Sequence, residues 1–213
     1  MEGLPYIAID VEASGPYPER YALLSLGACL VTKETYSYEE AQSRGLIFYA
    51  EIRPHTLECD LSAMKVGCSQ LEILEGKGDV YDARKNTFSH LRTIELLSRT
   101  ASDPKEVANR FRSFIWSHTG GGGEVCGIAD TTFFDSGWMT WWLGKRQVEL
   151  AMIRFHHLGI DLRSLLVGHK KDLGAKLSRL GAPRNARPHH AGHDALFLAN
   201  QTTVLFRELG FKL

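Results

Sequence analysis

The feature that most constrains the fold is a short apolar run near the N-terminus, Tyr6-Ile7-Ala8-Ile9-Asp10-Val11-Glu12. Apolar runs rich in β-branched residues are typical of buried strands. Because side chains alternate along a strand, Asp10 and Glu12 must point to the same face. Neighbouring carboxylates repel each other and lose hydration, which a divalent cation such as Mg²⁺ relieves. The run therefore indicates a metal site, although a strand that simply ends in solvent with two acids has the same pattern.

The length and composition are those of an ordinary globular domain. The chain has 213 residues, of which 44% are hydrophobic and 23% charged, enough for one domain with a sizeable core. Lys and Arg total 25, as do Asp and Glu, so no global positive field attracts a polyanion. Binding of nucleic acid would therefore need a local basic patch or a bound metal.

Cysteine usage and hydropathy bear on the location of the protein. Cys29, Cys59, Cys68 and Cys126 form no C-x-x-C pair and are too sparse for a disulfide scaffold, which is typical of reduced thiols. The first strand follows Met1-Glu2 directly, without the pattern of a secretory signal, and the most apolar run, residues 21–31, is too short to span a bilayer. We therefore expect a soluble cytoplasmic protein with no membrane partner.

The hydrophobic pattern predicts a mixed-sheet α/β domain without an internal boundary, so that residues 1–213 form a single domain. Strands are expected over residues 6–12, 22–32 and 45–52. Their connections, including an exposed polar loop over residues 32–44, are too short for crossover helices, so the three strands should form an antiparallel meander. Further short strands are expected over residues 124–129 and 160–162.

Helices are expected mainly in the second half of the chain. One begins at Asp103-Pro104, where Ser102 or Asp103 is a suitable N-cap and proline fits the first turn. Others are expected over residues 133–142, 163–167, 171–180 and 191–209. The four glycines at 120–123 lack the lysine of a P-loop and indicate a linker. Residues 53–101 suggest only short helical pieces, 69–74 and 88–97, which either wrap over the sheet or roof a site.

Three later residues add to the first motif. Asp135 lies where a helix begins after a strand and two phenylalanines, and His189 and Asp194 lie five residues apart at a loop-to-helix junction. A histidine in such a loop and an aspartate in the first helical turn can face one cavity. Taken singly, each aspartate is equally well explained as an acid at a helix N-terminus, and His189 as a surface histidine.

Together, Ile-Asp-Val-Glu, Phe-Asp and His-x₄-Asp resemble, in their order along nearly the whole chain, the motifs of the DEDDh (DnaQ-like) 3′–5′ exonucleases. The Glu-Ala-Ser-Gly-Pro after the first strand and the Phe-Asp-x₃-Met-x-Trp-Trp helix resemble a bacterial-type, single-domain branch of this family. The resemblance implies a ribonuclease H-like mixed sheet flanked by helices. Residues 53–101 match only loosely and are treated as a helical insert.

Two motifs contain alternatives. Asp130 precedes the Phe-Asp pair at a place where the family often has asparagine or a similar residue, so it is an alternative to Asp135, which fits the Phe-Asp pattern. His190 and His193 would mimic a base if the alignment slipped, but only His189 lies five residues before Asp194.

The resemblance implies a metal-dependent 3′–5′ exonuclease that removes 5′-nucleoside monophosphates from the 3′ end of DNA or RNA, with two divalent ions, Mg²⁺ or Mn²⁺. Asp10 would bridge both ions, Glu12 and Asp194 would complete one site, and Asp135 would act on the other. His189 would be the general base and must be neutral to act. Because a histidine titrates at about 6.5 in model peptides, activity should rise from acid toward neutral pH.

Several neighbouring residues are candidate substrate contacts. Ser14 and Tyr17 follow the Asp-x-Glu strand and are placed to contact the terminal nucleotide. Phe134, beside Asp135, is a further candidate, although an aromatic side chain there is more commonly part of the core. The same core interpretation is preferred for the tryptophans that share one helix face, Trp138, Trp141 and Trp142.

Basic residues flank the His189 loop. Arg187, together with Arg184, Lys170 and Lys171, is placed to hold substrate phosphates, although a solvated basic face is the more common outcome. The favoured partner is a single-stranded 3′ end, and a homodimer is also considered. Two alternatives to the exonuclease are a nucleic-acid-binding domain of the same fold without turnover and a metal phosphohydrolase of small nucleotides. Discrimination of DNA from RNA depends on contacts to the 2′-OH, which no motif encodes.

Overall fold

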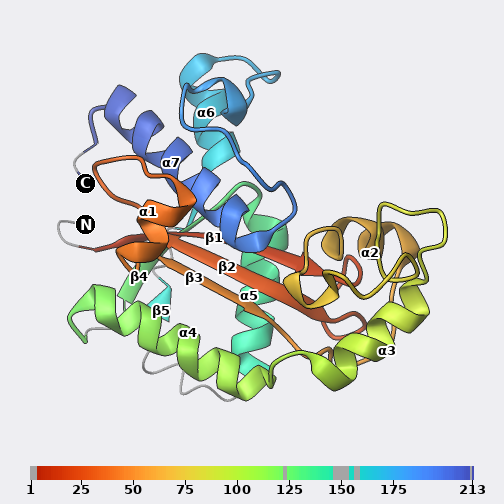
Figure 1. The fold of residues 1–213 in the computed structure, drawn as a ribbon. Helices are drawn as coiled ribbons and strands as arrows, with labels where there is room; N and C mark the ends of the chain where they lie inside the picture. The colour runs from red at the N-terminus through yellow and green to blue at the C-terminus, as the bar shows by residue number, and fades with distance from the viewer. Residues whose placement is uncertain (1–3, 122–123, 146–153, 156–158, 212) are drawn as a thin grey trace.

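The computed structural model describes residues 4–121, 124–145, 154–155, 159–211 and 213. Within these ranges a mixed sheet forms the centre of the molecule, with the strand order β3-β2-β1-β4-β5 and with β6 paired to β4 (Figure 1). The strands are β1 (Tyr6–Ala13), β2 (Leu23–Leu30), β3 (Ile47–Glu51), β4 (Glu124–Ala129), β5 (Arg154–Phe155) and β6 (Ile160–Asp161). The helices are α1 (Tyr38–Ser43), α2 (Leu61–Gly67), α3 (His90–Thr100), α4 (Pro104–Thr119), α5 (Thr132–Lys145), α6 (Leu162–Lys170) and α7 (Ala191–Glu208).

Strand β1 lies inside the sheet between β2 and β4. It pairs antiparallel with β2, which places Asp10 opposite Gly27 and Glu12 opposite Ser25, and it pairs parallel with β4. β2 pairs antiparallel with β3, whereas β4 pairs parallel with β5 and with β6. The predicted α/β fold with a mixed sheet and an antiparallel first half is therefore confirmed.

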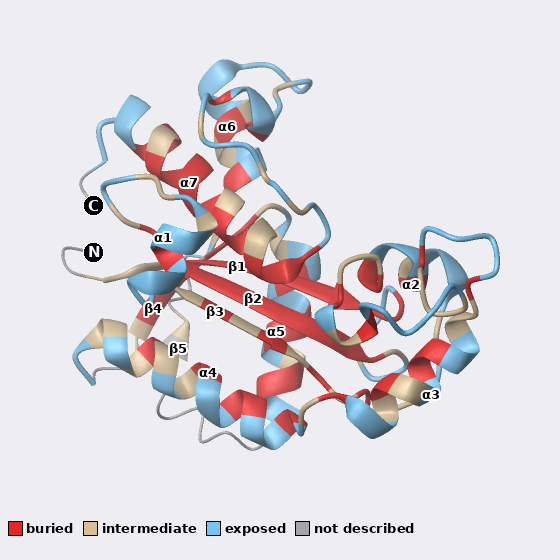
Figure 2. Cartoon of the chain, viewed as in Figure 1, coloured by how far each residue is buried: buried red, intermediate tan, exposed pale blue. Residues whose placement is uncertain are grey.

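Alternation along β1 gives the sheet two different faces. Ile7, Ile9 and Val11 belong to an apolar cluster with residues of α4 and α5, whereas Ala8 belongs to a second cluster with residues of α7. Asp10 and Glu12 have the same parity as Ala8, so they project from the face that α7 covers. Figure 2 shows the consequence, since the central strands are buried and the helices are buried mainly along their sheet-facing sides.

The insert, residues 53–101, packs at one end of the sheet. Its apolar side chains cluster around Leu24 of β2 and include Met64 of α2 and Ile94 of α3. The expectation for residues 88–97 corresponds to α3, but the expected helix at residues 69–74 is reduced to a 3₁₀ turn, Glu72–Leu74. Helix α2 was missed because its seven residues are too few to repeat a helical pattern, and packing of Met64 stabilises it instead.

Two other expectations were wrong. Part of the expected exposed loop, residues 32–44, forms α1, which begins with a capping box between Ser37 and Glu40. The expected helix over residues 171–180 is only a 3₁₀ turn, Leu177–Arg179. Helix α6 ends where Lys171 takes a left-handed conformation with φ 53°, so the chain leaves the helical path at the point where the new helix was expected.

Further details concern the linker, the aromatic residues and the edge of the sheet. Gly120 ends α4 in a left-handed conformation, whereas residues 122–123 of the expected linker lie outside the described residues.

Trp138 and Trp142 are each 1% exposed, which confirms them as core, but Phe134 is 37% exposed and is not a core residue. β5, which pairs with β4, was not predicted, since two residues carry no pattern. Among the described residues, no helix has the length and apolar character needed to cross a membrane.

Candidate active site

The carboxylates of β1 lie at the end of the strand beside α7. Glu12 is 8% exposed, and one carboxylate oxygen of Asp10 is buried without a hydrogen-bond partner among the described residues. Burial, followed by the charges of Asp135, Glu12 and Asp194, raises the pKa of Asp10 well above its usual range. Burial and the charges of Asp194 and Asp135 likewise raise the pKa of Glu12 to about 8. These acids therefore hold their negative charge at a high free-energy cost unless a cation joins them.

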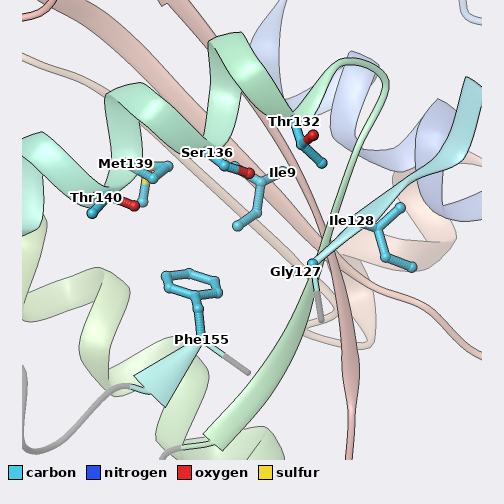
Figure 3. Close-up of a pocket in the computed structure, with 9 residues that line it drawn as sticks. Ile9, Gly127, Ile128, Thr132, Ser136, Met139, Thr140 and Phe155 are labelled. Atoms are coloured by element: carbon cyan, nitrogen blue, oxygen red, sulfur yellow. The ribbon is translucent and has the colours of Figure 1, made fainter. Parts of the chain in front are cut away.

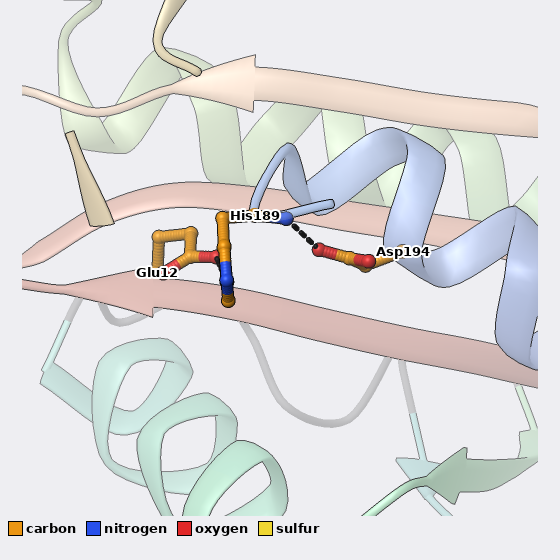
Figure 4. Close-up of side chains that lie close together, drawn as sticks. All are labelled: Glu12, His189 and Asp194. Carbon is orange, nitrogen blue, oxygen red and sulfur yellow. Dashed lines mark hydrogen bonds and ion pairs between the residues drawn. The ribbon is translucent and has the colours of Figure 1, made fainter. Parts of the chain in front are cut away.

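Helix α7 brings a histidine and an aspartate to the same place (Figure 4). His189 precedes the helix in a left-handed conformation with φ 68°, and its backbone amide donates to Asp194 Oδ2 at 2.7 Å. Its Nδ1 lies 3.9 Å from Glu12 Oε1. The potential ligand atoms of Glu12, His189 and Asp194 all lie within 4.8 Å of one another. Glu12 and His189, 177 residues apart in the sequence, thus meet at one group of potential metal-ligand atoms.

The loop before α7 fixes the orientation of Asp194. The side-chain amide of Asn185 donates to Asp194 Oδ1, so both carboxylate oxygens are held by this loop. The side-chain oxygen of Asn185, Oδ1, in turn accepts a hydrogen bond from the backbone amide of Arg187 at 3.0 Å. Burial still raises the pKa of Asp194, which shows that these bonds do not fully replace its lost hydration. Asn185 was not among the predicted site residues, because no spacing or periodicity marks it.

Asp135 reaches the other acids from α5, which packs on the face of the sheet opposite to α7. It lies in the first turn of α5 and is 6% exposed, and its Oδ1 accepts a hydrogen bond from the backbone amide of Val11 at 3.2 Å. Burial raises its pKa to about 7. The alternative acid, Asp130, accepts two hydrogen bonds from Arg163, at 2.9 and 2.6 Å. Asp135 is bonded to the backbone of Val11, the residue between Asp10 and Glu12, whereas Asp130 is already paired with a guanidinium. The geometry therefore favours Asp135 as the acid of the site.

The two alternative histidines are held by other contacts. His190 is 1% exposed, stacks on Tyr49 and places Nε2 3.3 Å from Glu72 Oε1. His193 stacks on Tyr38 with 3.7 Å between ring centroids, and burial lowers its pKa to about 4. His189 is the member of this group whose ring nitrogen faces Glu12, with a side chain that is 56% exposed.

The donor set suits a hard divalent cation. Asp10, Glu12, Asp135 and Asp194 offer carboxylate oxygens, and the buried oxygen of Asp10, which has no hydrogen-bond partner within the described ranges, lies among charges of its own sign. Mg²⁺ and Mn²⁺ bind such ligands and would relieve both the repulsion and the missing hydrogen bond. The residues present therefore fit the metal that the sequence motifs imply.

The structure separates the candidate substrate contacts into two kinds. Tyr17 is 67% exposed, and Phe134 is also exposed, beside Phe133 at 98%. Ser14 is fully buried, and its hydroxyl accepts from the Ala22 amide and donates to the Glu58 carbonyl, each at 2.9 Å. Ser14 therefore already has two partners within the protein.

Arg187 is also occupied by contacts within the protein. Its guanidinium donates to Glu75 Oε1 at 2.8 Å and lies within 3.4 Å of both Gln70 oxygens. A contact from Arg187 to a substrate phosphate would therefore compete with its ion pair to the insert.

A cavity of about 400 Å³ lies on the other face of the sheet (Figure 3). It is bordered by Ile9 of β1, Gly127 of β4 and the side of α5 that carries Ser136 and Met139. Ile9 faces this cavity, whereas its neighbour Asp10 faces α7, so the cavity is not the place where the carboxylates meet.

The fold has known counterparts, although comparison of the sequence with protein-family models and with curated proteins finds no match. The nuclease domain of 3'hExo, a DEDDh family member solved bound to rAMP, aligns over 97% of this chain and 94% of its own, with 13% identity and a TM-score of 0.61. A full-length 3'-exonuclease aligns over 98% and 84%, with 14% identity and a TM-score of 0.60. E. coli exonuclease I in complex with a dA16 oligonucleotide aligns over 96% of this chain but 41% of its own, with 9% identity and a TM-score of 0.57. The predicted resemblance is confirmed at the level of structure, because this chain has the fold of the DEDDh 3′-exonucleases.

Proposed function

We propose that the protein is a metal-dependent 3′–5′ exonuclease that hydrolyses phosphodiester bonds and releases 5′-nucleoside monophosphates. The observation that carries this proposal is the convergence of Asp10, Glu12, Asp135 and Asp194 around a buried carboxylate oxygen without a partner among the described residues. The exposed imidazole of His189 lies beside this group. Carboxylates in such a cluster suit divalent metals, and an accessible imidazole suits removal of a proton from water.

Each residue has a role that its position supports. The four carboxylates would hold two Mg²⁺ or Mn²⁺ ions, which when bound activate a water molecule and stabilise the leaving 3′ oxygen. Because Nδ1 of His189 faces Glu12, Nε2 is left to accept the proton of the attacking water. Asn185 and the His189 amide bond the two oxygens of Asp194 and so fix the position of this proposed metal ligand relative to His189, the proposed base.

The structural neighbours support a nucleic-acid substrate. The nuclease domain of 3'hExo is bound to rAMP, a nucleoside monophosphate, and exonuclease I is bound to a dA16 oligonucleotide. We propose by analogy that this chain acts on the 3′ end of a single strand, with Tyr17 and Phe134 as exposed contacts for the terminal nucleotides. The contacts predicted for Ser14 and Arg187 remain part of the proposal, but each would have to compete with the bonds described above.

We further propose that residues 1–213 act as a single cytoplasmic domain. The insert supports this because it shares an apolar cluster with Leu24 of β2 instead of forming a core of its own. The free thiols of Cys29, Cys59 and Cys68 support a reducing compartment. The homodimer remains a prediction.

The direct test is digestion of 5′-labelled single-stranded DNA and RNA oligomers with Mg²⁺, Mn²⁺ or EDTA, with Asp10→Asn as the inactive variant. We expect a metal-dependent ladder that shortens from the 3′ end, release of mononucleotides, and loss of both in Asp10→Asn. The thymidine 5′-monophosphate p-nitrophenyl ester, a small phosphodiester, is assayed in parallel. Turnover of this ester without shortening of any oligomer would replace the proposal by a small-nucleotide phosphohydrolase. No turnover of either substrate, despite metal binding, would favour a binding domain without catalysis.

A further inference from the structure

The chain segment that leads to His189 and the start of α7, residues 162–188, is strongly basic, although the whole chain is neutral. Residues 162–188 contain seven lysines and arginines and a single acid, Asp172, whereas the chain as a whole has a formal net charge of +0. In Figure 1 this segment comprises α6 and the outlying loop that follows it and leads back to the first turn of α7. Positive charge is thus concentrated in the stretch that delivers His189 and Asp194.

The structure separates these cations into paired and unpaired ones. Arg163 pairs with Asp130, Lys170 with Glu208, and Arg187 with Glu75. The remaining four are exposed and form no ion pair with the part of the chain that the structure describes: Lys171, Lys176, Arg179 and Arg184. The nearby carboxylate of Asp172 is bonded to the backbone amide of Gly174 within its own turn.

The outward direction of these cations is fixed by packing. Leu177 and Leu180 are 6% and 8% exposed and belong to the apolar cluster beneath α7, so they anchor the segment. Lys176 and Arg179, which adjoin these leucines in the sequence, remain in solvent. An apolar anchor with flanking exposed cations gives a fixed positive surface and not a freely moving tail.

The positive surface reaches the candidate active site. Arg184 is followed directly by Asn185, whose side chain bonds Asp194. Arg184 also lines a groove of about 180 Å³ with the aromatic residues Tyr36, Tyr38 and Phe197. Basic and aromatic side chains together are typical of surfaces that follow a single-stranded nucleic acid, since they contact phosphates and bases without reading sequence.

We infer that Lys171, Lys176, Arg179 and Arg184 form a track that binds the phosphates of a polynucleotide upstream of its 3′ end. The inference rests on the proposed exonuclease function and deepens it, because a nucleic acid longer than one nucleotide is needed to occupy the track. Such binding is electrostatic and weakens with salt, with a slope of about 0.7 for each single-strand phosphate contact. A mononucleotide ester that fills only the carboxylate site does not reach the track.

The test compares two quadruple variants with the same loss of charge. The track variant carries Lys171→Gln, Lys176→Gln, Arg179→Gln and Arg184→Gln. The control variant carries Lys33→Gln, Arg92→Gln, Arg99→Gln and Lys105→Gln, which replace exposed cations outside the segment. The measurements are kcat/KM for 5′-labelled oligodeoxythymidylate and oligouridylate and for the p-nitrophenyl ester, each from 50 to 300 mM KCl.

We expect the ratio of oligomer to ester kcat/KM to fall roughly tenfold or more in the track variant at low salt, with a shallower salt dependence, and to change little in the control. Equal ratios and equal salt slopes in the two variants would overturn the track while leaving the exonuclease intact. Binding to phosphatidylserine vesicles that is lost in the track variant, with unchanged oligomer turnover, would instead assign the surface to a membrane. Failure of the wild type on all oligomers would reject the exonuclease proposal, and the track with it.

Discussion

Gly27 on β2 lies against the carbonyl group of Ala191, the first residue of α7, so closely that a Cβ at position 27 would be 1.9 Å from the carbonyl oxygen. Gly27 is also the residue paired with Asp10 across the two strands. The missing side chain therefore lets α7 approach the sheet beside the central carboxylate, and it brings Asp194 and His189 within reach of β1. A glycine on β2 that belongs to no motif thus sets the geometry of the site.

Gly27→Ala should displace the start of α7 and reduce both activity and stability. The neighbouring atoms are backbone, which cannot move aside as a flexible side chain would, so we expect a loss of about 1–3 kcal/mol in the free energy of unfolding. Urea unfolding and oligomer digestion measure the two effects. Gly168→Ala in α6 is the matched control, because its added Cβ would meet no described atom within 4 Å beyond its chain neighbours and the backbone of its own helix, and it should be neutral or stabilising. Equal behaviour of the two variants would show that the close approach does not position α7.

Asp135→Asn should lower kcat roughly 100-fold or more if Asp135 is the proposed metal ligand, because the amide removes a ligand charge worth about 3 kcal/mol or more to the transition state. Asparagine retains an oxygen that can accept the hydrogen bond from the Val11 amide, so the fold should be preserved. Asp130→Asn is the comparison, since Asp130 is paired with Arg163, and its effect should be less than tenfold. Digestion of labelled oligomers by both variants at saturating Mg²⁺ decides between the two acids. A larger loss in Asp130→Asn would reverse their assignment.

The parts of the site that sequence could predict are those encoded by local patterns. Alternation along β1 sends Asp10 and Glu12 to one face whatever the rest of the chain does, and the start of α7 after His189 follows from ordinary helix signals. The same local rules failed for α1, α2 and the residues after Lys171. Those segments are short, so capping, packing and a single left-handed residue decide their conformation more than periodicity does.

The contacts that orient the site residues could not be predicted, because they join distant segments without a local signal. Asn185 is one polar residue among several in its loop, and only the folded chain shows that it holds Asp194. Arg187 was expected to face substrate, yet its closest partner is Glu75, 112 residues away. Residue type and spacing predicted that Glu12, His189 and Asp194 meet at one place, whereas the hydrogen-bond partners that orient them depended on the tertiary structure.

The metal-free protein should lose stability as the pH rises from about 4.5 to 8. Burial and neighbouring charges raise the pKa of Glu12 to about 8, and burial raises that of Asp135 to about 7. In this window these carboxyl groups bind more protons in the folded protein than in the unfolded chain, so the free energy of unfolding falls with increasing pH. The lowered pKa of His193, about 4, opposes this effect below about pH 6.5, so the fall should be steepest between about pH 6.5 and 8. Thermal unfolding in EDTA between pH 5 and 8.5 should show a decreasing Tm, and Glu12→Gln should flatten the curve. Excess Mg²⁺ should restore Tm most at high pH, where the carboxylates are charged. A Tm in EDTA that rises steadily over this range would contradict the buried, mutually repelling carboxylates.

The ion pair between Arg187 and Glu75 allows the two roles of Arg187 to be distinguished. If the arginine anchors the catalytic loop to the insert, Glu75→Gln and Arg187→Gln should each lower kcat two- to fivefold with little change in KM, the range expected for a partly exposed pair worth up to about 1 kcal/mol. The double variant should then be no worse than either single variant, because both remove the same contact. If Arg187 instead binds a substrate phosphate, Glu75→Gln frees the guanidinium and should lower KM, whereas Arg187→Gln raises it. Glu95→Gln, on the exposed side of α3, is the control for loss of an acid from the insert. Steady-state kinetics on a labelled oligomer separate the two outcomes, since KM for Glu75→Gln should stay nearly constant in the first case and fall in the second.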